Sequence, residues 1–218
     1  VPLEIAGGEC RKLQGLTLRN IGLKLWGKGK KPVYEDQGEL LFMPYGLSGP
    51  IILSASAHMR EYEKDRYTVC IDLKPALDEQ KLEARILRDI GESPNRDVEK
   101  LLCGLVPHSM APVLSRRLGL PPTLKANSLT REQRRALIRM LKHFEINVTG
   151  VRPVAEAIVT AGGVKVSEVK PNTMESKLVE GLYFAGEVLD VDAYTGGFNL
   201  QIAWATGHLA GVSAAERE

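Results

Sequence analysis

The sequence predicts an α+β protein: a β-barrel-like domain with an inserted helical subdomain, followed by a partial, C-terminal segment of a Rossmann-like domain. Three observations predict this class. Apolar residues alternate with polar ones in the first third of the chain, and they recur at helical spacing in the middle. Near the end, a short apolar segment runs into glycines and then into a long helical stretch.

The β-barrel part is expected over residues 1–77, as a meander of short strands. Apolar residues alternate over 16–26, with a slip near Asn20 that indicates two strands or one strand with a bulge. A turn of glycines and lysines at 27–32 ends this segment. Further runs typical of strands follow at 33–35, 39–45 and 67–73.

The helical subdomain is expected over residues 78–145. Asp78 is a plausible N-cap for a helix with apolar residues at helical spacing, and Thr130 with Gln133 fits a capping box before another such helix. Strand patterns return over 146–160, so the helical part is interpreted as an insertion between strands of the barrel.

Two glycine-containing turns admit a structural and a functional interpretation. Gly46-Leu-Ser-Gly-Pro50 precedes a helical run in which Pro50 occupies the first position, and such a turn is more often only a turn than an anion site. Thr160-Ala-Gly-Gly-Val164 reads first as a tight turn between strands. The functional alternative is a crossing back into a nucleotide-binding domain, with Gly162 and Gly163 letting backbone pass near a ligand.

The C-terminal segment, residues 161–218, carries the most informative pattern. A short buried strand is expected at 182–185, ahead of Gly186 and Glu187, and a double glycine then opens a long helix near Phe198. A helix N-terminus presents unpaired N–H groups and a positive dipole end, which suits a phosphate or the electron-rich edge of a flavin. The alternative is an ordinary strand, loop and helix.

Composition restricts the function classes. The 218 residues are 44% hydrophobic and 26% charged, with a net charge of +2, as in an ordinary folded protein. No apolar run is long enough to cross a bilayer and no signal peptide is visible, so a cytoplasmic location is expected. No disulfide framework and no metal site is predicted, because neither the cysteines nor the histidines have suitable spacing. The residues concerned are Cys10, Cys70, Cys103, His58, His108, His143 and His208.

One segment, residues 116–142, is strongly basic. It holds eight Lys and Arg residues against the single acid Glu132, which gives +7. Such a segment can contact nucleic-acid phosphates. It has no interleaved aromatic residues and matches no reading-helix motif, so a solvated helix face is favoured and a nucleic-acid partner is not expected.

Six strings of the chain, in this order, are similar to those of one known family: 1–4, 13–16, 46–50, 160–164, 173–176 and 181–211. Together they resemble the aminoacetone oxidase-like FAD-binding enzymes, bacterial flavoproteins also described as NAD(FAD)-utilising dehydrogenases. The resemblance covers essentially the whole chain. It implies an inserted barrel-and-helix domain followed by the C-terminal segment of an FAD-binding domain. Met43-Pro44 departs from the family, which often has Thr-His there.

The resemblance also implies which residues face the cofactor. Gly162 and Gly163 would lie where the chain re-enters the FAD domain. The ribityl and pyrophosphate side would be lined by Gly186, Glu187 and Asp190. A helix N-terminus would face the flavin ring, formed by Gly196, Gly197, Phe198 and Asn199.

The favoured hypothesis is therefore that the chain is part of an FAD-dependent oxidoreductase. It would supply the substrate-side inserted domain and the closing half of the FAD site, with NADH or NADPH as candidate reductant and a small-molecule substrate. No Gly-x-Gly-x-x-Gly fingerprint occurs, so we expect the chain to begin inside a longer protein whose N-terminal FAD-binding segment is missing here. No catalytic residue is identified.

The residues leave open two other hypotheses for the function of the chain. The chain can be a folded fragment with neither cofactor nor catalysis of its own. It can also be a nucleic-acid or protein-binding module that uses the basic segment 116–142.

Overall fold

The computed structural model describes residues 1–59 and 66–216 and divides the chain into two compact units. The first unit is Pro2–Val151, and the second is Arg152–Glu218 together with Val1. The change of unit therefore falls nine residues before the expected boundary at 160/161.

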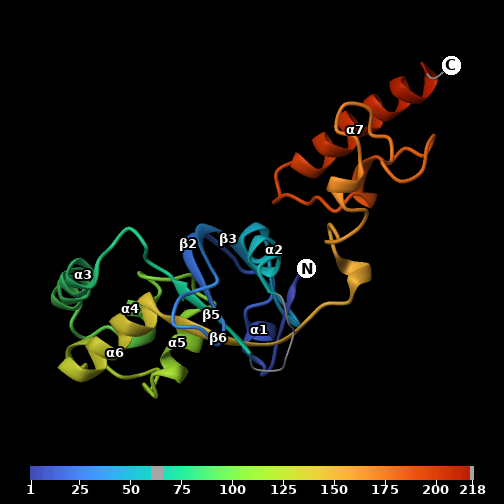
Figure 1. The fold of residues 1–218 in the computed structure, drawn as a ribbon. Coiled ribbons are helices and arrows are strands. Elements are labelled where there is room, and N and C mark those ends of the chain that lie inside the picture. Colours follow the sequence, from blue (N-terminus) through green and yellow to red (C-terminus); the bar gives the residue numbers. More distant parts are fainter. Residues whose placement is uncertain (60–65, 217–218) are drawn as a thin grey trace. The chain divides into compact units, whose positions relative to one another are not determined.

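The first unit contains a closed barrel of six strands in which every neighbouring pair is antiparallel (Figure 1). Its strand order is β1-β4-β3-β2-β5-β6. Closure leaves the sheet without an unpaired edge. The strands are β1 (Leu3–Ile5), β2 (Thr17–Trp26), β3 (Tyr34–Met43), β4 (Gly46–Ser48), β5 (Tyr67–Asp72) and β6 (Phe144–Val151).

The slip expected near Asn20 is confirmed as an irregularity inside one strand. The register of β2 against β3 shifts between Leu18 and Ile21, and Asn20 has a φ of 54°. The two strand segments expected at 33–35 and 39–45 are a single strand, β3, because its residues from Tyr34 to Leu41 pair with β2. The expectation of a break between them was wrong.

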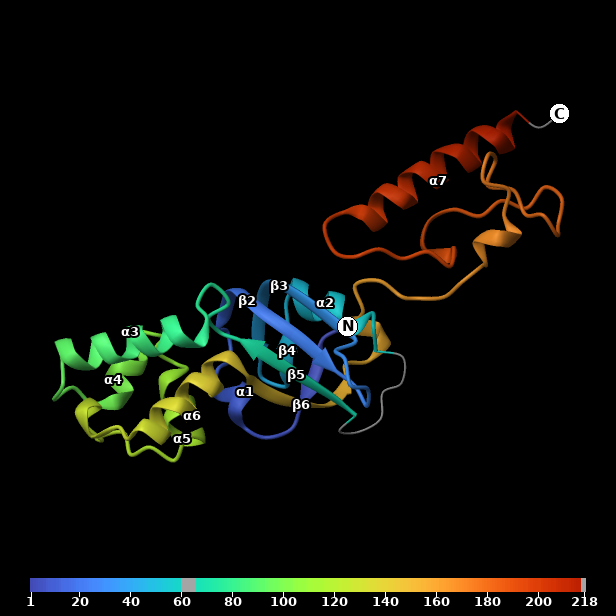
Figure 2. The same cartoon turned by 60° about the vertical axis from the view of Figure 1, so that its left-hand side comes forward.

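The helical subdomain is inserted between two strands that are neighbours in the barrel. β5 pairs with β6 in a register that runs from Tyr67↔Val148 to Ile71↔Phe144. Between them the chain forms helices that gather at one end of the barrel (Figures 1 and 2). These are α3 (Glu79–Glu92), α4 (Val98–Leu102), α5 (Ala111–Arg117), the 3-10 turn η1 (Ala126–Ser128) and α6 (Arg131–Lys142).

Both predicted N-caps are confirmed. The Asp78 carboxylate accepts a hydrogen bond from the Lys81 amide at 2.7 Å, at the start of α3. Thr130 and Gln133 form a reciprocal capping box at the start of α6. The apolar sides of these helices and the barrel interior form one continuous core, so the barrel and its insertion fold as a single unit.

Two short helices complete this unit, α1 (Glu9–Lys12) and α2 (Pro50–Ser56). Pro50 stands in the first turn of α2, as predicted. The turn before it serves the barrel: Gly46 pairs with β1, and a Cβ placed there would meet the Leu3 carbonyl oxygen at 2.0 Å. The motif at 46–50 is therefore explained by strand packing.

The second unit has little regular structure besides one long helix, α7 (Phe198–Ala215). Three 3-10 turns precede it: η2 (Val154–Glu156), η3 (Val166–Glu168) and η4 (Gly186–Val188). Among its described residues, the core contains four buried apolar side chains: Val169, Met174, Leu189 and Ala210. A core this small gives a unit of this length little stability of its own.

Two strand expectations in this unit were wrong. Residues 154–160 form η2 and irregular chain, because Pro153 interrupts the strand and the Pro153 carbonyl accepts from the Glu156 amide. The strand expected at 182–185 is reduced to one bridge, Glu175↔Tyr183, and Leu182 is 42% exposed. The described residues of this unit provide no adjacent strand to pair with it. In the described parts of the chain, no helix has both the length and the apolar character needed to span a membrane.

Candidate functional site

The candidate site in the second unit is organised around Glu187, at the first turn of η4. Its Oε1 accepts two hydrogen bonds from Thr160, from the amide at 2.8 Å and from the hydroxyl at 2.9 Å. The backbone bond and then the hydroxyl bond hold the pKa of the Glu187 carboxyl below its ordinary value. Within the described residues Oε2 has no hydrogen-bond partner, so this charged oxygen can accept from a ligand.

The start of α7 supplies the opposite side. Gly197 adopts a φ of 90° and precedes the helix without a side-chain cap. Gln201 makes the first intrahelical bond, and no described group accepts from the amides of Phe198, Asn199 and Leu200. These amides are the positive end of an 18-residue helix.

Side-chain hydrogen bonds hold the loop that precedes α7, and the turn η4, against the helix. Asn199 bonds the loop at Ala193, accepting from its amide at 2.8 Å and donating to its carbonyl at 2.7 Å. The Thr206 hydroxyl accepts from the Gly186 amide at 2.9 Å, which fastens η4 to the middle of α7. As a result, Gly186, Gly196 and Gly197 lie close together.

A pocket of about 370 Å³ opens between these segments. Its lining includes five of the nine site residues predicted from the sequence: Gly186, Glu187, Gly196, Gly197 and Asn199. Its apolar walls come from positions that sequence reasoning did not select: Ile158, Val159, Val191, Leu200, Ile202 and Ala203. Their only signal in the sequence was apolar character on either side of the glycine turns.

The other four predicted residues lie outside this pocket. Gly163 is needed for packing, since a Cβ there would meet the Val188 carbonyl oxygen at 2.3 Å. Gly162 has a φ of 96° and faces open space. Asp190 donates its amide to Val164. The Phe198 side chain is 61% exposed and covers Gly196.

Residues 173–177 form a hydrogen-bonded loop just before the segment that leads to Gly186. Glu175, which is 9% exposed, accepts from the Gly181 amide at 2.8 Å and from Lys170 Nζ at 2.7 Å. The Ser176 hydroxyl accepts from the Leu178 and Val179 amides.

The surface of α7 is unusual for a surface helix. Ala210 is its only buried residue, whereas Leu200 is 58% and Trp204 66% exposed. A helix that is apolar on all sides is normally buried in a core. Large exposed apolar patches mark places where another structure binds.

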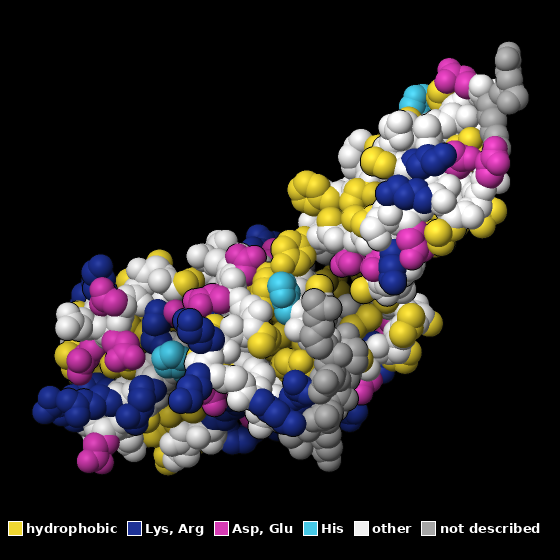
Figure 3. Space-filling model, viewed as in Figure 1, with side chains coloured by type: hydrophobic (Ala, Val, Ile, Leu, Met, Phe, Trp, Pro, Cys, Tyr) yellow, Lys and Arg dark blue, Asp and Glu magenta, His cyan; other side chains and the backbone are white. Residues whose placement is uncertain are grey.

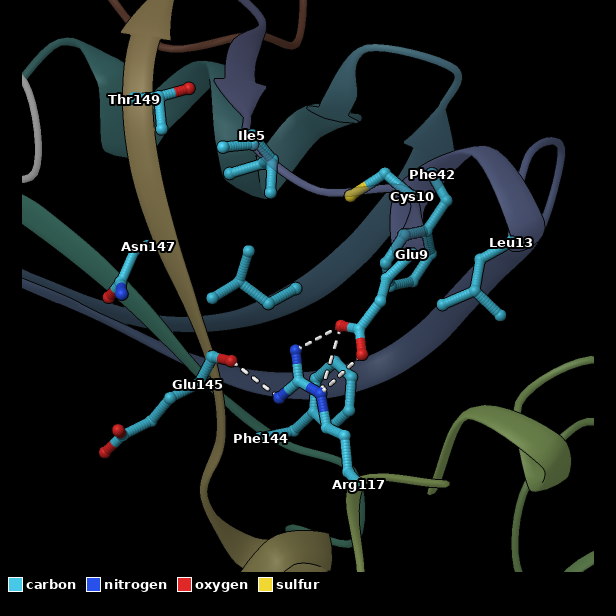
Figure 4. Close-up of a pocket in the computed structure, with 12 residues that line it drawn as sticks. Ile5, Glu9, Cys10, Leu13, Phe42, Arg117, Phe144, Glu145, Asn147 and Thr149 are labelled. Carbon is cyan, nitrogen blue, oxygen red and sulfur yellow. Dashed lines mark hydrogen bonds and ion pairs between the residues drawn. The ribbon is translucent and has the colours of Figure 1, made fainter. Parts of the chain in front are cut away.

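The barrel unit has a pocket of its own, of about 490 Å³, beside α1 (Figure 4). Arg117 from α5 points into it and donates from Nε to both oxygens of Glu9, at 3.1 and 3.0 Å. The same guanidinium donates to the Glu145 carbonyl and lies 4.0 Å from the centre of the Phe144 ring. Cys10 is buried at this pocket, and burial raises the pKa of its thiol to about 11. The pocket therefore holds a structural ion pair and a protonated thiol, which is not a nucleophile at neutral pH.

A closed antiparallel barrel with a helical insertion, followed by a glycine-lined pocket at a helix N-terminus, defines an α+β protein of the barrel-plus-helices class. The family model for the HI0933-like protein barrel and H2TH domain matches residues 1–159. The chain belongs to this family.

Curated relatives include oxidoreductases. The chain is 35% identical over 191 residues to the 3-dehydro-bile acid delta(4,6)-reductase of Clostridium scindens, covering 87% of this chain and 47% of that protein. It is 35% identical over 167 residues to the ribosomal RNA dihydrouridine synthase of Escherichia coli, covering 77% of this chain and 40% of that protein. The same enzyme of Haemophilus influenzae is 32% identical over 175 residues, with 80% and 42% covered. The chain thus spans less than half the length of these relatives.

Proposed function

We propose that this chain is part of an FAD-dependent oxidoreductase of the aminoacetone oxidase-like type, in which it supplies the substrate-side barrel domain and the closing half of the FAD site. The observation that carries the proposal is the pocket at 186–203. It combines a helix N-terminus with unpartnered amides, a carboxylate with one free oxygen, and glycines whose backbone approaches the space directly.

The residues of the pocket fit a flavin nucleotide. The free Oε2 of Glu187 suits a sugar or ribityl hydroxyl, and the amides at the start of α7 suit the electron-rich edge of the ring. Ile158, Val159 and Ile202 form an apolar wall that suits a planar aromatic ring. FAD, when bound, supplies hydride transfer that no side chain provides. The role of the chain is to hold the ring and to favour negative charge on it through the α7 dipole.

A complementary FAD-binding segment is part of the proposal. The 218 residues contain no Gly-x-Gly-x-x-Gly loop to hold the pyrophosphate. The exposed apolar surface of α7 and the small core of the second unit are what such a segment would cover.

The reaction class we propose is the reduction of a carbon–carbon double bond conjugated to a carbonyl. One relative is a 3-dehydro-bile acid delta(4,6)-reductase and another is a ribosomal RNA dihydrouridine synthase. Both reactions add a hydride and a proton across such a bond. NADH or NADPH is the proposed reductant.

Two substrate classes are consistent with this chemistry: a small apolar ketone, and a uridine within RNA. The first follows from the relative with the longer match, and the second from two relatives that act on ribosomal RNA. The basic segment 116–142 is the feature of this chain that favours RNA.

The experiment that tests the proposal is a titration of FAD into the purified chain, followed by flavin fluorescence. It is done with the chain alone and with the chain fused behind the N-terminal segment of the Escherichia coli relative. We expect weak binding to the chain and retention of about one flavin per fusion protein. Absence of flavin from both proteins would contradict the proposed function. Stoichiometric binding by the chain alone would contradict the half-site model, in which the chain supplies only the closing half of the FAD site.

A matched pair of variants tests the pocket itself. Glu187→Gln in the fusion should weaken FAD binding roughly tenfold, the size of a lost hydrogen bond to a charged group. Glu216→Gln makes the same charge change on an exposed residue of the same unit and should leave binding unchanged. Equal losses of FAD affinity in the two variants would show that Glu187 does not contact the cofactor.

A further inference from the structure

Some cations of the basic segment 116–142 form ion pairs or hydrogen bonds through their side chains, and others do not. Arg117 pairs with Glu9, Lys125 with Asp97 at 2.6 Å, and Lys142 with Asp72 at 2.6 Å. Arg134 donates to the Leu129 carbonyl at 2.7 Å. Among the described residues, the side chains of the remaining four have neither an ion pair nor a hydrogen bond: Arg116, Arg131, Arg135 and Arg139.

Three of the free cations form a row on α6. Arg131, Arg135 and Arg139 are spaced at i, i+4 and i+8, so they lie on one face of the helix, with a rise of about 6 Å between neighbours. All three are exposed. Like charges at this spacing destabilise a helix.

The cations of helix α3, which packs against α6, have acidic partners, unlike those of the row. Arg85 pairs with Asp89 at 2.8 Å and Arg88 with Glu92 at 3.9 Å, both at i,i+4 spacing, and Lys81 pairs with Asp78 at 3.3 Å. The cations of α3 are therefore neutralised within their own helix. Those of α6 are available to an external anion.

Three carboxylates lie near the row without forming an ion pair with it. Glu79 and Glu83 line a groove with Arg135 and Arg139, and Glu132 lies on α6 itself. None of these acids forms an ion pair with the row. Figure 3 shows Lys and Arg side chains gathered over the helical subdomain with Asp and Glu among them. A polyanion would thus meet the row from its solvent side.

We propose that Arg131, Arg135 and Arg139 form a surface that binds the phosphate backbone of a structured RNA. Three cations in a line match a linear polyanion better than a single small anion. The absence of exposed aromatic residues from the segment indicates contacts to phosphates and not to bases. The choice of RNA rests on the proposed function, in which a uridine within RNA is one substrate class. The sequence alone favoured a solvated face, and the pairing pattern is the new observation.

The test measures RNA binding by the purified chain with fluorescence anisotropy at several salt concentrations. The probe is a labelled stem-loop of ribosomal RNA, with a DNA duplex of equal length beside it. We expect salt-dependent binding of the RNA that is tighter than binding of the DNA. The variant Arg131→Gln with Arg135→Gln and Arg139→Gln should bind RNA roughly tenfold or more weakly. The slope of log K against log salt should become shallower by about 2 to 3, since each phosphate contact contributes roughly 0.7–0.9.

The matched control is Lys81→Gln with Arg85→Gln and Arg88→Gln, which makes the same change in net charge on α3. It should keep the RNA affinity and the salt slope. Equal losses in both variants, no binding of RNA by the wild type at low salt, or equal binding of DNA would each overturn the proposal. Measuring both FAD and RNA binding by the wild-type fusion protein separates the two ideas. RNA binding without flavin would contradict only the proposed function, and flavin without RNA binding would contradict only this inference.

Discussion

Arg117 and Glu9 form a bidentate ion pair although they are 108 residues apart in sequence. The pair joins α5 of the helical subdomain to α1 beside the barrel. Both side chains are partly buried, with 24% and 35% exposed. It therefore fixes the insertion to the barrel through groups that solvent screens only in part.

Arg117→Ala is expected to lower the free energy of unfolding of the barrel unit by roughly 1–3 kcal/mol, because Glu9 and the Glu145 carbonyl each lose a charged donor. Urea unfolding followed by circular dichroism measures the change. Arg116→Ala is the matched control, since Arg116 is the exposed neighbour without a partner among the described residues. It should stay within about 0.5 kcal/mol of the wild type. Similar losses in both variants would show that the ion pair contributes nothing specific.

Gly46→Ala is expected to disrupt barrel closure. The new Cβ would lie 2.0 Å from the Leu3 carbonyl oxygen, which is backbone of the paired strand β1 and cannot rotate away. We expect a loss of about 3 kcal/mol or more, at the upper end for overpacking. Gly8→Ala is the control, because a Cβ at Gly8 meets nothing within 4 Å. Thermal unfolding of the two variants side by side tests the difference, and equal melting temperatures would contradict it.

The barrel and its insertion could be predicted because their signals are local. Alternation marked β2 and β5, and the caps at Asp78 and Thr130 marked helices that the structure contains. The failures have a common physical cause. Whether residues 33–45 were one strand, and whether 182–185 paired at all, depended on neighbours distant in sequence.

The candidate site was predictable only in part for the same reason. Glycines with positive φ and an acid beside them were visible as residue types. The bond from Thr160 to Glu187 and the apolar wall at Ile158 and Ile202 depend on the loops meeting in space. The pairing of the cations in 116–142 likewise required the structure, because their partners Glu9, Asp72 and Asp97 lie outside that segment.

The buried thiols are expected to react slowly. Burial raises the pKa of both Cys10 and Cys70 to about 11, so at pH 8 roughly one thiol in a thousand is ionised. Cys103 is less buried and should react first with an aromatic disulfide reagent. In the Cys103→Ser variant we expect no fast phase until denaturant is added. A fast phase that persists in this variant would contradict the burial of the other two thiols.

The pH dependence of the second unit follows from Glu187. Its pKa is lowered in the folded state, so its contribution to stability is present above the unfolded value of about 4.3 and is lost as the pH falls through the folded value. Thr160→Val removes the hydroxyl donor but keeps the amide, and should move the pKa part of the way back up. A carboxyl-detected NMR titration measures this shift, with Thr123→Val in the barrel unit as the control. An unchanged pKa in Thr160→Val would show that the hydroxyl bond is not formed in solution.

Trp204 reports on whether another segment covers α7. Its side chain is 66% exposed, so in the chain alone its fluorescence should be that of a tryptophan in water and should be quenched readily by acrylamide. The Trp26→Phe variant isolates this signal, because the chain has only two tryptophans. Fusion behind the N-terminal segment of the Escherichia coli relative should shift the emission to shorter wavelength and protect it from quenching, since burial removes water from the indole. In the reciprocal Trp204→Phe variant, the emission of Trp26 should not respond to the fusion. If Trp204 stays equally quenchable in the fusion, the apolar surface of α7 is not where the complementary segment packs, and the half-site model fails independently of any flavin measurement.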